Sequence, residues 1–117
     1  MNNLRNSVQL IGNLAANPEI KEINGGKKLA KVAIATKDIY QNSNGEKVVE
    51  TSWHNIVAWG KVAENMEVFL RKGNEVAMKG KLQHRNYIDK DGNKRNITEI
   101  LVKEFMLLSK SQPKTEA

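Results

Sequence analysis

The segment from Gly60 to Arg71 breaks the hydrophobic pattern of the rest of the chain, and this break constrains the fold more than any other feature. In GKVAENMEVFLR, apolar residues recur at the i, i+4, i+7 and i+8 spacing of an amphipathic helix, at Val62, Met66, Phe69 and Leu70. Gly73 stands just beyond the segment, where a helix stop is expected. The spacing therefore predicts one helix, over residues 60–71.

The segments on either side have the pattern of β-strands separated by turns. Strands are expected at about 4–15, 28–39, 48–59, 75–88 and 94–108. The strand at 75–88 alternates most clearly, with Val76, Met78 and Leu82 on one face and Lys79, Lys81, Arg85 and Tyr87 on the other. Turns are predicted at Asn17-Pro18, Asn24-Gly25-Gly26 and the DKDGN sequence of residues 89–93, with a longer polar loop at 41–47.

Five strands with one helix between the third and the fourth predict an all-β fold, the OB-fold, which is a five-stranded, partly open barrel. A helix packed on an open antiparallel sheet fits the same pattern nearly as well. A chain of 117 residues forms one domain. We expect that domain to cover residues 1–108, followed by a short polar C-terminal tail at 109–117.

The composition favours a polyanionic partner and is compatible with a reducing compartment. The formal charge of +6 and the pI near 9.6 suit nucleic acid first and an anionic membrane second, although solubility alone also explains such an excess. The chain has no cysteine, which excludes disulfides and cysteine-based zinc clusters. The N-terminus lacks the pattern of a signal peptide, and no stretch is long and apolar enough to span a membrane. We therefore expect a cytoplasmic protein that is not membrane-bound.

The sequence contains no recognisable catalytic or metal site. His54 and His84 are far apart and have no carboxylate at ligand spacing. Asp89 and Asp91 resemble the start of a calcium loop, but Gly92 stands at the fourth position, where such a loop needs its glycine at the sixth. These residues are better explained as a turn. We expect no enzyme activity, no cofactor and no metal.

Aromatic residues interleaved with cations indicate binding of single-stranded nucleic acid. Unpaired bases stack on aromatic rings, while Lys and Arg neutralise phosphates and release counterions. Trp53 and Trp59 occupy alternate positions of one strand, and either could instead be a core residue. Tyr40, beside the polar loop, and Tyr87, on the basic face, favour exposure. The lysines could equally form only a solvated face.

The chain resembles the bacterial single-stranded DNA-binding protein family over nearly its whole length. The resemblance is carried by the order and spacing of short motifs: VQLIGNL at 8–14 with Pro18-Glu19, AIAT at 33–36, TSWHNIV at 51–57, WGKVAE at 59–64, LRKG at 70–73, GKL at 80–82, and RNY at 85–87 with Asp91-Gly92. It implies an OB-fold homotetramer that binds and protects single-stranded DNA, independently of sequence, in replication, repair and recombination.

The resemblance also implies which residues contact the strand. The stacking rings would be Tyr40, Trp53, Trp59 and Tyr87, and the phosphate contacts would be Arg5, Lys61, Arg71, Lys72, Lys79, Lys81, Arg85 and Arg95. His54 matches a histidine near the family's subunit contacts. Asn55 and Gln83 stand where arginine is frequent, which removes two phosphate contacts.

The C-terminus departs from the family pattern. The family continues into a long Gly/Pro/Gln-rich linker with an acidic tip that recruits replication and repair proteins, whereas this sequence ends at Lys114-Thr115-Glu116-Ala117. We therefore expect a tailless or shortened form without tip-mediated recruitment. Two other functions remain open: an OB-fold that binds RNA or belongs to a primosome-like assembly, and an assembly protein whose basic face meets an acidic protein.

Overall fold

The computed structural model describes residues 4–109, which form a β-barrel with one α-helix. Of the tail expected at 109–117, only Ser109 lies among the described residues. The rest of the tail, up to the end of the sequence, lies outside them. The elements are a 3-10 turn η1 (Leu4–Asn6), β1 (Val8–Leu14), β2 (Glu19–Ile23), η2 (Asn24–Gly26), β3 (Lys27–Gln41), β4 (Lys47–Trp59), α1 (Gly60–Phe69), β5 (Glu75–Ile88) and β6 (Lys94–Leu107).

Five of the strands close into a barrel. The sheet order is β1-β5-β6-β4-β3-β2, and an additional pairing between β1 and β3 closes the ring. That closure joins Asn13 to Ala35 and Leu14 to Ile34. All pairings are antiparallel except β4 with β6, which run parallel at Ile56–Ile100 and Val57–Leu101. The barrel confirms the predicted OB-fold and excludes the open-sheet alternative, because the first strand pairs with both β5 and β3.

The predicted elements are found, with two differences at the N-terminal end. The first strand is shorter than expected, because residues 4–6 form a 3-10 turn and β1 begins only at Val8. A short strand that was not expected, β2, pairs with the start of β3 and lies outside the closed ring. The helix lies between β4 and β5 as predicted and ends at Phe69, two residues before the expected Arg71.

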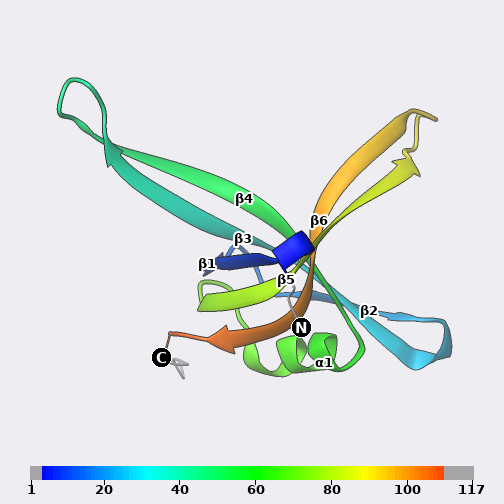
Figure 1. Ribbon diagram of the computed structural model, residues 1–117. Coiled ribbons are helices and arrows are strands. Elements are labelled where there is room, and N and C mark those ends of the chain that lie inside the picture. Colours follow the sequence, from blue (N-terminus) through cyan, green and yellow to red (C-terminus); the bar gives the residue numbers. More distant parts are fainter. Residues whose placement is uncertain (1–3, 110–117) are drawn as a thin grey trace.

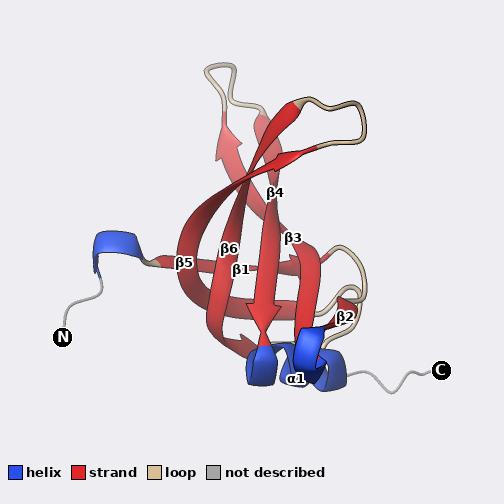
Figure 2. Cartoon of the chain, turned by 90° about the vertical axis from the view of Figure 1, so that its right-hand side faces the viewer, coloured by secondary structure: helices blue, strands red, loops and turns tan. Residues whose placement is uncertain are grey.

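The core fills the barrel and the space beneath α1. Val32, Ile34, Ile56 and Val76 come from the inward faces of three strands, and Met66 of α1 packs against the same cluster. Figure 2 shows the helix lying across one end of the barrel. Leu70, directly after the helix, is also fully buried, so the apolar face predicted for residues 60–71 covers the open end of the barrel. Phe69, predicted on that face, is instead 57% exposed.

Two glycines allow strands to approach one another at the points where the barrel bends. A Cβ atom at Gly12 would clash with the carbonyl oxygen of Ala35, beside the β1–β3 closure. A Cβ atom at Gly80 would clash with the backbone of Leu101 on β6. The β5–β6 register shifts at Gly80, which pairs with Val102 while Lys79 pairs with Glu104. Lys103 is therefore the extra residue of a β-bulge, a feature that bends a strand and redirects its side chains.

Two long hairpins extend beyond the barrel and diverge from each other (Figure 1). The β3–β4 hairpin pairs continuously from Leu29–Trp59 to Gln41–Lys47, and the β5–β6 hairpin continues to Ile88–Lys94. Asp89 forms the turn of the second hairpin, because its Oδ1 accepts hydrogen bonds from the backbone N–H groups of Asp91 and Asn93. This geometry confirms the turn expected at residues 89–93.

Candidate nucleic-acid interface

The four aromatic rings singled out from the sequence all lie on the surface. Trp53 is 64% exposed, Tyr40 45%, Tyr87 43% and Trp59 38%. Each ring is therefore accessible to a ligand from solvent. The alternative that the two tryptophans are core residues is thereby excluded.

Trp53 and Trp59 lie on the outer face of β4, at alternating positions that also include Asn55. Across the sheet, Trp53 is paired with Ala35 of β3, a residue with a small side chain. Core residues Ile56 and Ala58 stand between these outward positions and are 1% and 0% exposed. The two rings are six residues apart in an extended strand, which corresponds to about 20 Å. They therefore present two separate stacking positions along one strand.

Tyr40 lies on the β3–β4 hairpin but on the opposite face from Trp53. The register pairs Tyr40 with Val48 and Ala35 with Trp53, and Ala35 lies five positions before Tyr40 on β3. Side chains alternate between faces along a strand, so an odd separation places the two rings on opposite sides of the hairpin. The structure thus does not bring all four rings to one face of a single chain.

A basic groove of about 460 Å³ joins cations that are distant in the sequence. Its lining includes Arg5 and Ser7 near the start of β1, Lys79 and Lys81 on β5, and Lys103 and Glu104 on β6, so it holds four cations and one carboxylate. Arg5, Lys79 and Lys81 were expected as phosphate contacts, and the structure brings them together. Lys103 was missed by the sequence analysis, and its bulge position directs it to this groove.

A second hollow of about 400 Å³ lies beside the first and contains the ring of Trp59. Lys27, Val62, Leu101 and Lys103 line it with that ring. Lys103 lines both hollows, so the basic groove continues to the indole. Lys27 was also missed, and its Nζ lies 5.6 Å from the centroid of the Trp59 ring, within cation–π distance.

One sequence signal could have revealed Lys103. Alternation along β6 breaks at Lys103-Glu104, where two charged residues are adjacent between Val102 and Phe105. A bulge inserts one extra residue into a strand, so it interrupts the alternation of the strand's two faces. Lys27 carries no such signal, because its proximity to Trp59 depends on the register between β3 and β4.

Three of the predicted phosphate contacts are engaged within the protein. Arg85 forms an ion pair with Glu99 at 2.9 Å, and Arg95 forms one with Asp89 at 2.7 Å. Nη1 of Arg71 donates hydrogen bonds to the backbone carbonyls of Glu67 and Leu70, at the C-terminal end of α1. A cation at that end also interacts favourably with the helix dipole.

These ion pairs shift the pKa values of Arg85, Glu99 and Asp89. The hydrogen bond from Arg85 lowers the pKa of Glu99, even though burial acts in the opposite direction. The same contact raises the pKa of Arg85. In the second pair, the hydrogen bond from Arg95 lowers the pKa of Asp89, with further lowering by backbone N–H groups of the turn.

The remaining predicted residues lie away from the two hollows. Lys61, in the first turn of α1, and Lys72, in the α1–β5 loop, are exposed and line neither hollow. His54 is half-buried, and its Nε2 lies 2.9 Å from Oγ1 of Thr36 on the neighbouring strand. That contact gives His54 a partner within its own chain.

The part of the chain that the structure describes contains no group of three or more His, Asp or Glu side chains placed to hold a metal ion. Within the same residues, no helix has the length and apolar character needed to cross a membrane.

A closed five-stranded barrel with a helix between its third and fourth strands defines an OB-fold protein. The chain belongs to the single-strand binding protein family, whose sequence model matches residues 5–108. It is 43% identical over 108 residues to single-stranded DNA-binding protein 1 of Xylella fastidiosa, covering 92% of this chain and 79% of that protein. It is 38% identical to single-stranded DNA-binding protein 1 of Chlorobaculum tepidum, covering 88% of this chain and 64% of that protein.

A solved structure agrees with the fold. The Plasmodium falciparum SSB in complex with single-stranded DNA superimposes with a TM-score of 0.83 and 31% identity, covering 93% of this chain and all of that one. Both bacterial relatives are longer than the region that matches this chain.

Proposed function

We propose that this protein binds and protects single-stranded DNA without reading its sequence. The observation that carries the proposal is the exposure of Tyr40, Trp53, Trp59 and Tyr87 on the strands of an OB-fold. Base stacking on aromatic rings contributes about 1–3 kcal/mol per base. Every base has a flat face, so such binding is tolerant of sequence.

The basic groove supplies the second part of the binding energy. Arg5, Lys79, Lys81 and Lys103 line it together, and Lys27 extends the positive charge to Trp59. Each phosphate neutralised in single-stranded DNA releases counterions and adds about −0.7 to the slope of log affinity against log salt concentration. Affinity is therefore expected to fall steeply as salt rises.

The wider role follows from family membership. Proteins of this family bind DNA without catalysis, in replication, repair and recombination, and we propose the same role here. We further propose a cytoplasmic homotetramer in which residues 1–108 form the binding domain and His54 lies near a subunit contact. Light scattering coupled to size exclusion tests the assembly, since a tetramer has about four times the 13.2 kDa mass of one chain.

Tetramer formation would also explain the position of Tyr40. On one chain, Tyr40 and Trp53 lie on opposite faces of the β3–β4 hairpin. A DNA strand that wraps around several subunits contacts both faces of the hairpin. Each ring can then stack on a base at a different point along the DNA.

The test of binding is tryptophan fluorescence during titration with oligo-dT, at low and moderate salt, with duplex DNA and an RNA of equal length as controls. Strong quenching by single-stranded DNA only, weakened by salt, supports the proposal. Preference for RNA supports an RNA-binding OB-fold instead. Absence of binding to any nucleic acid, checked by anisotropy of a labelled strand, overturns the proposal and favours an acidic protein partner for the basic groove.

A further inference from the structure

Glu99 is the buried carboxylate among the described residues of the chain. Glu99 lies on β6 and is 3% exposed, which is the lowest exposure of any charged residue among residues 4–109. A buried carboxylate is strongly unfavourable unless hydrogen bonds and an opposite charge compensate it. Glu99 must therefore be held by specific partners.

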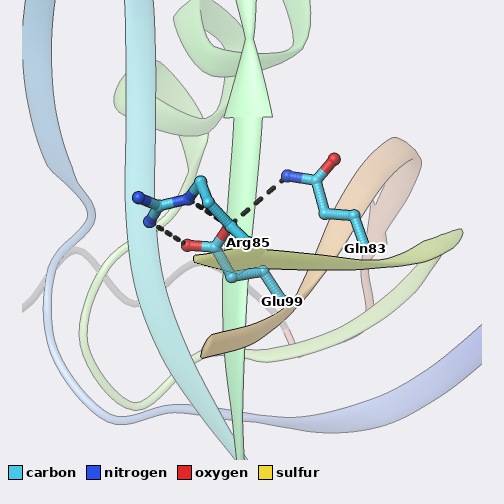
Figure 3. Close-up of polar contacts among 3 residues, drawn as sticks. All are labelled: Gln83, Arg85 and Glu99. Atoms are coloured by element: carbon cyan, nitrogen blue, oxygen red, sulfur yellow. Dashed lines mark hydrogen bonds and ion pairs between the residues drawn. The ribbon is translucent and has the colours of Figure 1, made fainter. Parts of the chain in front are cut away.

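Those partners come from the neighbouring strand (Figure 3). Nη2 of Arg85 donates to Oε2 of Glu99 at 2.9 Å, and Nε of Arg85 donates to Oε1 at 3.3 Å. Nε2 of Gln83 is 3.4 Å from the same Oε1. The two bonds from Arg85 form the bidentate arrangement that makes Arg–carboxylate pairs strong and geometrically specific.

The Arg85 guanidinium also lies near an aromatic ring. Its Cζ atom is 5.9 Å from the centroid of the Tyr87 ring. Arg85 and Tyr87 are two residues apart on β5 and therefore share one face of the strand. Glu99, Arg85 and Tyr87 thus form a connected series that ends at one of the proposed stacking rings.

We infer that Glu99 withholds Arg85 from phosphate and that Arg85, held in this way, is a positioning residue for the ring of Tyr87. This inference rests on the proposed function. The ion pair has no net charge, so its contact with a strand releases no counterions. A phosphate that recruited Arg85 would leave the Glu99 carboxylate buried without its cation, which opposes the exchange.

The inference predicts that Arg85 and the lysines of β5 contribute differently to the salt dependence of DNA binding. Lys81 shares the outer face of β5 with Arg85 and lines the basic groove without an ion pair among the contacts described here. Lys81→Gln is therefore the matched control. It should make the salt slope shallower by about 0.7, the value for one phosphate.

The experiment measures affinity for oligo-dT at several salt concentrations in variants of the full chain. The neutral pair Arg85→Gln with Glu99→Gln keeps the net charge and removes the buried carboxylate, which favours correct folding. We expect its slope to equal that of the unmodified protein, with affinity reduced several-fold. Glu99→Gln alone frees Arg85 and should steepen the slope by about 0.7.

A thermodynamic cycle with Tyr87→Ala tests the positioning role. If Arg85 acts through the ring, then the neutral pair lowers affinity in the original protein but has little further effect when Tyr87 is absent. A merely structural role would lower affinity equally in both backgrounds, and that result overturns the inference. A neutral pair whose slope is shallower by about 0.7, as for Lys81→Gln, also overturns it, because Arg85 then neutralises a phosphate.

Failure of the proposed function would give a different result from failure of the inference. In that case the unmodified protein would not bind oligo-dT at all, whereas failure of the inference leaves binding intact and changes only the slopes and the cycle. Thermal unfolding of each variant confirms that the compared proteins are folded.

Discussion

The ammonium group of Lys27 lies over the indole ring of Trp59, with Nζ 5.6 Å from the ring centroid. Lys27 begins β3, and Trp59 ends β4. The pair combines a phosphate-binding group and a stacking face within the reach of a single nucleotide. A DNA strand that crosses this point would contact the ammonium group and the indole ring together.

The next residue in the chain offers a matched control for that pair. Lys28 forms an ion pair with Glu67 of α1 at 2.8 Å, so its charge is compensated within the protein. We expect Lys27→Ala to weaken oligo-dT binding and to make the salt slope shallower by about 0.7. Lys28→Ala should leave the slope unchanged. Equal slopes for the two variants would remove Lys27 from the interface.

Trp53→Ala should separate binding from stability. Because the side chain is 64% exposed, its removal should change the free energy of unfolding by no more than about 0.5 kcal/mol. Loss of one stacking base should weaken affinity by about 1–3 kcal/mol, or roughly 5- to 150-fold. Anisotropy of a labelled oligo-dT measures the affinity and denaturant unfolding measures the stability. Trp53→Phe retains a ring and should restore most of the affinity; unchanged affinity in Trp53→Ala would rule out stacking at this position.

Gly80→Ala should destabilise the fold, since the added methyl group meets the backbone of Leu101 at the bulge. Overpacking of this kind costs about 1–3 kcal/mol. Lys79→Ala, at the preceding exposed position, is the control and should have little effect on stability. The free energy of unfolding from urea titration checks both. A Gly80→Ala protein as stable as the unmodified chain would mean that the close approach of β5 and β6 is not required.

Stability should fall in acid partly through Glu99. Arg85 lowers the pKa of this carboxyl in the folded protein, and Lys31 of β3 acts in the same direction. The stabilisation is fully present above the unfolded pKa, about 4.3, and is lost as the pH falls through the lower folded pKa. Glu99→Gln cannot titrate, so the stability difference between the two proteins should be largest near neutral pH and shrink below about pH 4. Urea titrations across this pH range measure the difference; a constant gap would contradict the assignment.

Much of the barrel could be predicted from local pattern. The helix follows from the spacing of Val62, Met66 and Leu70, and the turns follow from glycine-bearing polar segments. The short strand β2 was missed because five residues after Pro18 carry too little alternation to be distinguished from a loop. Barrel closure depends on Gly12, where the absence of a side chain, rather than any local preference, allows β1 to reach β3.

The site was predicted in residue type better than in arrangement. The aromatic positions followed from their pattern with cations and from the resemblance. Exposure was predicted for Tyr40 and Tyr87, and the structure shows that Trp53 and Trp59 are exposed as well. The partner of Arg85 could not be anticipated from local pattern, because Glu99 is 14 residues away and meets it only through the β5–β6 register. Lys103 likewise reaches the groove through a bulge. These contacts depend on strand register, which residue spacing alone does not determine.

The divergence of the two hairpins has a mechanical consequence. β4 and β6 are paired at Ile56–Ile100 and Val57–Leu101, and beyond those positions each described hairpin is held by its own ladder. One hairpin can therefore swing or fray at its tip without breaking a hydrogen bond of the other. Tyr40 lies on one hairpin and Tyr87 on the other. The distance between the two rings can therefore adjust to DNA strands of different curvature while the barrel stays intact.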